Sequence, residues 1–301
     1  MLPFWLSIGL LSAVQGGIVA LARAPHTPAL ARLRGRRWAV IPPLSVLGFV
    51  LVAALAERAS AQGLTYLALG AVPVLAAVAL GWLMPGARPA LALLALPLFA
   101  LAWADASALP GEAAALALSA FSCVALGVLL AVVTPPRWLA AGIVAMALVD
   151  AALVIADLLQ RPNRALNAAH PAAGLPRLQR ELLGSAVMGY GDLFIAGALG
   201  GLLALAAGTR VQSRSALLAV TLALCFDLLF FAVDELPATV PVALTLIVVL
   251  AARRRRSARS EPARAPAASA ARSPRRQAAG ARHPPAPDRP PRPTPPRPAG
   301  P

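Results

Sequence analysis

The sequence predicts an all-α polytopic membrane protein, a helical bundle of about nine transmembrane helices followed by a disordered C-terminal tail. Three observations support this fold class. Hydrophobic residues make up 59% of the 301 residues, and the mean hydropathy is +0.73. Apolar runs long enough to cross a hydrocarbon core of about 30 Å recur along the chain. A bilayer is therefore the expected solvent for most of these side chains.

The predicted spans are the apolar runs, taken in chain order. They cover approximately residues 3–22, 39–56, 64–84, 89–104, 113–134, 138–159, 185–208, 215–233 and 236–252. Pro42-Pro43 interrupts the second run, and the fourth and ninth are short for a crossing that needs about 20 residues. The first run lacks a basic N-terminal flank and is followed at once by Arg23, which favours a retained anchor over a cleaved signal peptide.

The chain divides into three regions. Residues 1–137 carry the first five predicted helices, and residues 138–252 carry the four that hold the candidate catalytic groups. Residues 253–301 contain 13 Arg and 13 Pro against two acidic residues, so they cannot bury a core and are expected to be disordered. Because this basic tail follows a span directly, we expect anionic lipid headgroups as its partner, and nucleic acid is disfavoured.

Arginine counts predict the orientation in the cell membrane. With nine spans, the loops 23–38, 85–88, 135–137 and 209–214 lie on the same side as the tail and hold nine Arg, whereas the opposite loops hold five. Cytoplasmic loops carry the excess of Lys and Arg. The N-terminus is therefore predicted outside and the C-terminal tail in the cytoplasm.

Two ionisable carboxyl groups lie within consecutive apolar runs, Asp150 in the sixth and Asp192 in the seventh. A charge there costs about 2.5 to 3.5 kcal/mol on insertion scales, so such residues mark proton relays, ion paths or catalytic groups. At 1.5 Å per residue both lie roughly 12 to 15 Å from the same loop, which allows them to meet. Two adjacent carboxyls can share a proton, so that one activates water while the other polarises a peptide carbonyl.

Asp192 closes the sequence Gly189-Tyr190-Gly191-Asp192. The glycines permit close approach and weaken a helix, and unwound backbone at membrane depth is tolerated only beside protein or a water-filled cavity. The ninth run opens with Leu236-Pro237-Ala238.

With these motifs the chain resembles the GxGD intramembrane aspartyl proteases, the presenilin and signal peptide peptidase family. The resemblance covers about residues 140–250 and implies a presenilin-like bundle of nine spans that cuts membrane-spanning peptide substrates without a cofactor. It implies Asp150 and Asp192 as the catalytic pair, and the following residues as substrate-binding or site-shaping: Gly189, Tyr190, Gly191, Leu236, Pro237 and Ala238. Val149 stands where the family commonly has Tyr, and Thr239 where it has Leu. Residues 241–244, Pro-Val-Ala-Leu, are a second partial match to the third motif.

Prepilin peptidases, which belong to the same superfamily, are a second resemblance. They also carry the Gly-x-Gly-Asp motif, but with a Lys two residues after the Asp, where this chain has Phe194. Their active site lies at the cytoplasmic face, and their first Asp lies near a loop ending Ile-Pro-Asn. Asp157 with Pro162-Asn163 loosely matches that pattern; otherwise Asp157 is a polar residue at a helix end near Arg161.

A proton-coupled transporter is the alternative from another functional class. Asp150, Asp192 and Asp227 could form a proton relay, although Asp227 is better explained as a polar contact between neighbouring spans. A purely structural membrane protein would leave two deep carboxyl groups without a role.

Other chemistry has no support in the sequence. Cys123 and Cys225 lie singly in apolar runs, and His26, His170 and His283 are too scattered to form a metal site. We find no phosphate-binding glycine loop and no G-x-S-x-G turn. Metal, nucleotide and serine hydrolase chemistry are therefore not predicted.

Overall fold

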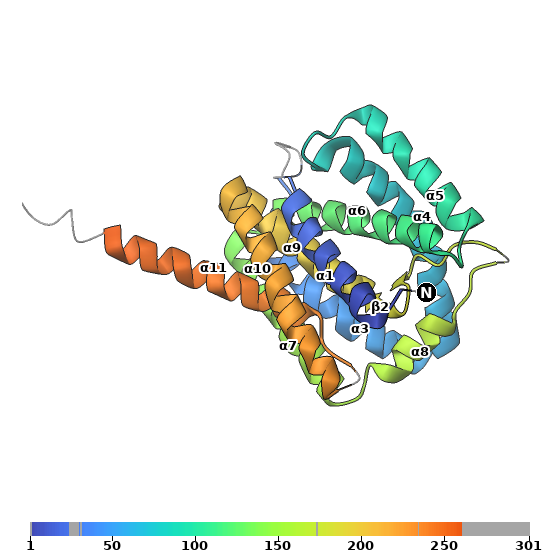
Figure 1. The fold of residues 1–301 in the computed structure, drawn as a ribbon. Coiled ribbons are helices and arrows are strands. Elements are labelled where there is room, and N and C mark those ends of the chain that lie inside the picture. The colour runs from blue at the N-terminus through green and yellow to red at the C-terminus, as the bar shows by residue number, and fades with distance from the viewer. Residues whose placement is uncertain (1, 24–29, 31, 173, 234, 261–301) are drawn as a thin grey trace, which may run out of the picture. The chain divides into compact units, whose positions relative to one another are not determined.

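The computed structural model describes residues 2–23, 30, 32–172, 174–233 and 235–260, and the residues up to Arg255 form one compact unit. That unit is built almost entirely from helices (Figure 1). The α-helices are α1 (Phe4–Leu21), α3 (Ile41–Leu55), α4 (Glu57–Val78), α5 (Ala95–Ala104), α6 (Leu109–Val133), α7 (Pro136–Ile155), α8 (Gln160–Ala168), α9 (Tyr190–Ala206), α10 (Thr209–Asp227) and α11 (Thr239–Ser260). Short segments of 3₁₀ or π-helix extend four of them, at Arg36–Val40, Ala79–Leu83, Pro89–Leu94 and Leu228–Phe231.

Six helices in the described part of the chain are long and apolar enough to cross a membrane. They are Phe4–Leu21, Arg36–Leu55, Glu57–Leu83, Leu109–Val133, Pro136–Ile155 and Thr209–Phe231. Two shorter apolar segments, Pro89–Ala104 and Tyr190–Ala206, accompany them. Large apolar side chains are exposed along several helices, among them Leu51, Leu67 and Leu96. Lipid tolerates such faces whereas water does not, so the structure indicates a membrane protein with a helical bundle, as predicted.

A small antiparallel hairpin lies where the sequence predicted the start of the seventh span. β1 (Arg180–Leu183) pairs with β2 (Ala186–Gly189), and Gly184 takes a φ of 61° in the turn between them. The helix α9 begins only at Tyr190, so the prediction of a span from residue 185 is wrong at its start. Residues 186–189 alternate between buried and exposed, which is the period of a strand, but their apolar character merges with the helix that follows.

The start of the basic tail also differs from the prediction. The helix α11 continues through Arg253 to Ser260, so disorder from residue 253 is wrong for this stretch. Arg is a good helix former, and extending an existing helix needs no new nucleus. Residues 261–301, which make up the rest of the predicted disordered tail, lie outside the described residues.

The closest helix crossing joins α6 to α9. A methyl group added at Gly197 of α9 would overlap the carbonyl oxygen of Cys123, and one added at Gly127 of α6 would overlap the backbone at Gly197. Small residues allow this approach between helices in a membrane. The helix α1 packs against α9 and α10, as Figure 1 shows. Helices from residues 1–137 and from residues 138–252 therefore share one core around α9.

This crossing gives a test of the packing. Gly197→Ala is expected to destabilise the protein by roughly 1 to 3 kcal/mol or more, because backbone atoms of α6 cannot yield as a side chain would. Gly70→Ala on α4 is the matched control, since an added methyl group there meets nothing within 4 Å. It should stabilise slightly through helix propensity. Thermal unfolding in detergent measures both; equal effects would contradict the close crossing.

Hydrogen bonds show which helix ends lie together. At one end, Arg23 N–H donates to Leu83 O (2.9 Å), Gly35 N–H donates to Val133 O (2.8 Å), and the Arg253 guanidinium donates to Ala206 O. We call this the arginine-rich end. At the other, the hairpin end, the turn of the hairpin contacts α1 and α6: Ser185 N–H donates to Ser7 Oγ (3.3 Å) and Gly184 N–H donates to Glu112 Oε2 (2.7 Å). Aromatic pairs Phe4–Phe230 and Trp5–Phe231 also lie here, as expected of a membrane–water boundary.

Candidate functional site

Asp150 lies in the second-last turn of α7, on a face that packs inside the bundle. Its side chain is only 8% exposed. The hydroxyl of Thr239, the first residue of α11, donates a hydrogen bond of 2.6 Å to Asp150 Oδ2. Thr239 is itself buried, so this bond joins two elements that are 89 residues apart in sequence. The Thr that departs from the family pattern is therefore in direct contact with the first candidate carboxyl.

Asp192 lies in the first turn of α9 and is partly buried. Its Oδ2 accepts the N–H of Gly189, the residue that caps the helix, at 3.1 Å. A carboxylate in the first turn of a helix satisfies an otherwise free N–H and interacts favourably with the helix dipole. Asp192 thus has a structural role at the helix start as well as its candidate chemical role.

The helices α7 and α9 pack against each other, which places the segments that carry Asp150 and Asp192 side by side. Gly191 faces the same part of α7, since a methyl group added there would lie 3.5 Å from Met146 Cε, one turn before Asp150. The predicted depth is wrong. Asp150 is five residues from the end of α7 and Asp192 two residues from the start of α9, so they lie roughly 3 to 8 Å inside the helix ends. The pair is near the hairpin end rather than the middle of the bundle.

The glycines act differently from the expectation. Gly189 has φ −75° and ψ 146°, ordinary extended backbone, and α9 runs without a break from Tyr190. The predicted weakening of a helix around the motif is therefore wrong, because the motif stands at a strand-to-helix junction. What Gly189 supplies is space, since a methyl group there would lie 3.0 Å from the carboxyl oxygen of Asp192.

Gln15 of α1 ties the two motifs together. Its side-chain amide donates to the carbonyl of Asp192 at 3.2 Å and to the carbonyl of Ala238 at 3.1 Å. Gln15 is 1% exposed. Ala238 is thereby held beside the first turn of α9, and its neighbour Thr239 beside Asp150. The structure brings Asp150, Asp192 and Ala238 to one place.

Leu236 and Pro237 line a groove next to this place. The groove has a volume of about 690 Å³ and lies between the end of α7, the end of α10 and residues 235–240. Ala151 and Val240, which also line it, are the chain neighbours of Asp150 and Thr239. The lining is mainly apolar, with Asp157 and Glu235 as its acidic members.

Tyr190 points to α6. Its hydroxyl lies 2.8 Å from Ser122 Oγ. Because Ser122 gives its own hydrogen to the carbonyl of Ser119 (2.7 Å), Tyr190 is the donor in this pair. The residue anchors the first turn of α9 on α6, which makes it a positioning residue for Asp192.

Asp157 and Asp227 make contacts of their own, different from those of Asp150 and Asp192. Asp157 follows the end of α7 with a φ of 55°, and the bonds Asp157 N–H to Val154 O and Leu158 N–H to Leu153 O close the helix. It is a helix-ending residue just beyond α7, although the predicted span extended to residue 159. Asp227 Oδ2 accepts the hydroxyl of Ser12 at 2.7 Å, so its explanation as a polar contact between helices is confirmed.

Glu181 of β1 is a buried acid that the sequence analysis did not single out. It is 1% exposed and faces Ser119 of α6, yet neither of its carboxyl oxygens has a hydrogen-bond partner. Burial raises the pKa of Glu181 to about 8. Glu181 is therefore mainly protonated at neutral pH.

Sequence reasoning also missed Gln15. Its signal is a single amide within an apolar run, a residue type that typically bonds across helices in membranes. Glu181 had a weaker signal, namely its alternation with Leu183 on one face of a strand. No group of three or more His, Cys, Asp or Glu side chains in the described part of the chain could hold a metal ion. Cys123 is buried and Cys225 exposed, each as a free thiol.

Comparisons with protein-family models, with curated proteins and with solved structures found no match to this chain.

Proposed function

We propose that the protein is an intramembrane aspartic endopeptidase with a presenilin-like catalytic region, in which Asp150 and Asp192 activate water. One observation supports this above all others. Two packed apolar helices each bring a carboxyl group to one place, and the segment that follows Pro237 is held beside both of them by Thr239 and Gln15. A structural role alone needs no second carboxyl group beside the helix-capping Asp192.

The proposed reaction needs one proton shared by the pair. The anionic carboxylate takes a proton from water as the water oxygen attacks the peptide carbonyl, while the protonated partner donates to the carbonyl oxygen. The tetrahedral intermediate then collapses, the C–N bond breaks, and the leaving nitrogen takes up the proton that the carboxylate had accepted from water, while the oxygen of the intermediate returns its proton to the partner carboxyl. The position near the hairpin end supports this chemistry, because water must reach the pair.

The apolar groove beside Pro237 supports a hydrophobic peptide as the substrate. A membrane-spanning segment could lie against Leu236, Pro237 and Val240, with its scissile bond directed to Asp150. Gly189 leaves free the space next to the carboxyl of Asp192 that a side chain would fill. These contacts are the substrate-binding elements of the proposal.

Cleavage by the purified full chain in liposomes tests the proposal. We expect it to cut a co-reconstituted membrane-spanning reporter, and a hydroxyethylene isostere, which mimics the tetrahedral intermediate of aspartic peptidases, to block the cut. Cleavage that resists this compound but stops with a metal chelator would contradict the aspartic mechanism. Proton-dependent uptake without cleavage would select the transporter instead.

A prepilin-peptidase-like enzyme is the second candidate, and the shallow position of the pair favours it. The two readings differ in orientation. In the presenilin-like proposal, the arginine-rich end is cytoplasmic and the tail from Arg253 contacts anionic headgroups. The protein is then multi-pass, with its N-terminus outside. Reporter fusions after Arg164 and after Arg253 distinguish them. A cytoplasmic position for Arg164 would put the pair at the inner face and select the prepilin-like reading.

Gln15 gives a prediction about positioning. Gln15→Met keeps the shape of the side chain but leaves the carbonyls of Asp192 and Ala238 without their donor, at a cost of about 1 to 3 kcal/mol. We expect a lower kcat, since the pair and the Pro237 segment are no longer held together.

The matched control is Gln212→Met. Gln212 of α10 also donates to carbonyl groups of the α1 region, Val19 O (2.8 Å) and Ala22 O (2.7 Å), but at the arginine-rich end. The two variants should lose similar stability, and only Gln15→Met should lose kcat. Equal losses of kcat would show that Gln15 is merely structural.

A further inference from the structure

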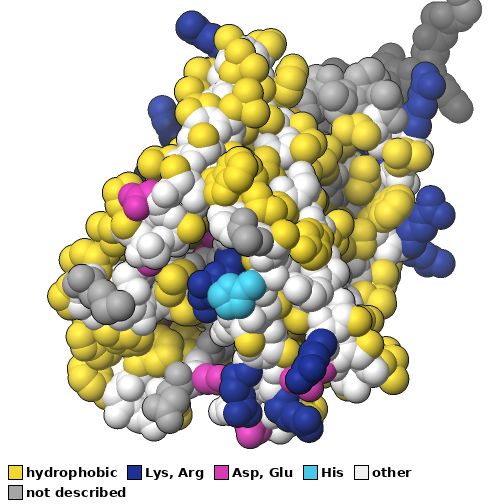
Figure 2. Space-filling view, turned by 90° about the vertical axis from the view of Figure 1, so that its right-hand side faces the viewer, with side chains coloured by type: hydrophobic (Ala, Val, Ile, Leu, Met, Phe, Trp, Pro, Cys, Tyr) yellow, Lys and Arg dark blue, Asp and Glu magenta, His cyan; other side chains and the backbone are white. Residues whose placement is uncertain are grey.

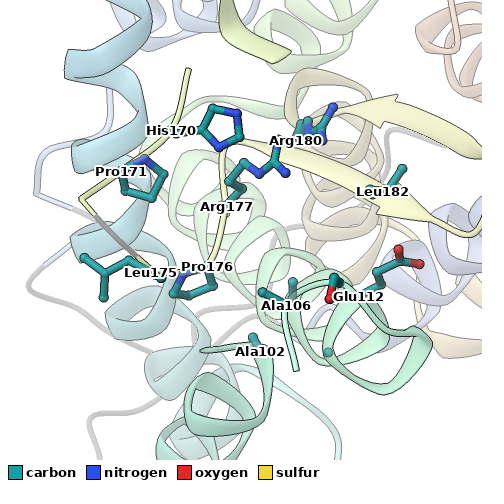
Figure 3. Close-up of a pocket in the computed structure, with 14 residues that line it drawn as sticks. Ala102, Ala106, Glu112, His170, Pro171, Leu175, Pro176, Arg177, Arg180 and Leu182 are labelled. Atoms are coloured by element: carbon teal, nitrogen blue, oxygen red, sulfur yellow. The ribbon is translucent and has the colours of Figure 1, made fainter. Parts of the chain in front are cut away.

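A second cavity lies at the hairpin end, apart from the groove beside Pro237. It has a volume of about 250 Å³ and lies between the end of α5, the start of α6 and residues 170–171 and 174–182. Figure 3 shows the side chains of His170, Arg177 and Arg180 gathered on one side of it, with Glu112 on another. The face in Figure 2 shows the histidine next to a basic side chain near its centre. None of these residues belongs to the proposed catalytic pair.

The guanidinium groups in this cavity lack partners. Among the described residues neither Arg177 nor Arg180 forms a hydrogen bond or an ion pair within 4.0 Å through its guanidinium, and Arg180 Nε is buried without any acceptor. Glu112 is already bound to the N–H of Gly184 (2.7 Å). Burial, and then the neighbouring charge of Arg177, lower the pKa of Arg180, while Glu112 opposes the shift. An unpaired buried donor is costly, and an anion in the cavity would remove that cost.

The level of the cavity in the membrane indicates which anion can reach it. It opens where α5 ends, and on that last turn Leu101 is 42% and Trp103 51% exposed. An exposed Trp at the end of an apolar helix marks the level of the lipid headgroups. Basic pockets between helices at this level are suited to phosphate headgroups, since guanidinium groups match phosphate oxygens bidentately.

We propose that this cavity binds the phosphate of an anionic phospholipid headgroup through Arg177 and Arg180, with His170 at its mouth. The lining carries two Arg against one Glu, so a single phosphodiester charge balances it. The site does not depend on the proposed peptidase activity. The site is nevertheless connected to Asp192 through the hairpin. Arg180 of β1 pairs with Gly189 of β2, and the N–H of Gly189 binds Asp192.

Lipid titration of the full-length chain in a non-ionic detergent tests the site. We expect native mass spectrometry to show saturable binding of phosphatidylglycerol that is tighter than that of phosphatidylcholine. Arg177→Gln and Arg180→Gln should each weaken it roughly tenfold, the loss of one charged hydrogen bond. The matched control is Arg161→Gln with Arg164→Gln on α8, which are exposed at the same end and outside the cavity. The basic tail is identical in all variants and adds the same background.

The outcomes are distinct. Unchanged lipid affinity in both cavity variants, or an equal loss in the α8 control, would overturn the site, because the attraction would then be diffuse. Arg177→Lys and Arg180→Lys keep the charge and should fold, so they carry the test if a Gln variant does not fold; Lys lacks the bidentate fork and should show a partial loss. Inorganic phosphate is the second ligand probe. Competition by it at equal concentration would keep the site and assign it to free phosphate, whereas competition only by diacyl lipid assigns it to the bilayer.

Discussion

Replacing Asp150 or Asp192 by asparagine is expected to reduce cleavage of a membrane-spanning reporter by roughly 10²- to 10⁴-fold or more. Asparagine is the sharpest change here because its side-chain oxygen can still accept the bond from Thr239 or from the N–H of Gly189. Only the ionisable proton is lost. Because the two groups act as one unit, the double variant should be no less active than either single variant.

The measurement is the rate of reporter cleavage in liposomes, with thermal unfolding as the check on folding. Asp157→Asn is the control, since Asp157 follows the end of α7 with a positive φ that Asn also tolerates, and its carboxyl lines the groove rather than binding Thr239 or Gly189. It should keep near-normal activity. Loss of cleavage with Asp157→Asn but not with Asp150→Asn would transfer the first catalytic role to Asp157 and favour the prepilin-like alternative.

Glu181→Gln is expected to stabilise the folded protein, and to do so more as the pH rises. The pKa of Glu181 is about 8 in the folded protein against an ordinary value of 4.5. Between these values the unfolded chain has released the proton that the folded protein still holds. The contribution of Glu181 to the free energy of unfolding is therefore full below pH 4.5 and is lost as the pH rises to 8, by an amount on the order of 5 kcal/mol. Glutamine cannot ionise and escapes this loss.

The difference in melting temperature between Glu181→Gln and the wild-type protein measures this effect from pH 4.5 to pH 8.5. Other acids titrate in the same range, but they contribute equally to both proteins. Glu57→Gln is the control, because it makes the same chemical change at an exposed position at the start of α4. A difference that does not grow with pH would mean that Glu181 is ionised in the folded protein.

The helices could be predicted because a segment that crosses a bilayer must meet one simple condition, namely that it contains a long apolar run. Every predicted span overlaps a helix of the structure, but only six helices of the described residues are long and apolar enough to cross a membrane, and several bounds differ from the prediction. The hairpin could not be predicted from hydropathy, and the reason is physical. Residues 186–189 are as apolar as the helix that follows, and what makes them a strand is the left-handed turn at Gly184 and pairing with β1. Hydropathy does not register either of these.

The candidate site was predictable in part. Asp150 and Asp192 are conspicuous because charge is rare in apolar runs. Gln15 and Glu181 are not conspicuous in the sequence. Gln15 matters because it binds groups far away in the sequence, and Glu181 because it is buried without a hydrogen-bond partner. Thr239 was noted as a departure from a motif, yet its hydroxyl binds Asp150. Contacts that join distant segments are set by packing, and a single sequence does not reveal which buried polar groups will meet.

The bridge made by Gln15 also constrains how the protein is made. Its amide binds carbonyl groups that are 177 and 223 residues further along the chain. During synthesis α1 therefore leaves the ribosome and enters the bilayer long before its partners exist, with a polar amide that nothing yet satisfies. The site can close only after Ala238 has been inserted and α11 begins to form. The candidate site therefore cannot be complete before the last helix is inserted, and α1 stays in the membrane without these partners until then.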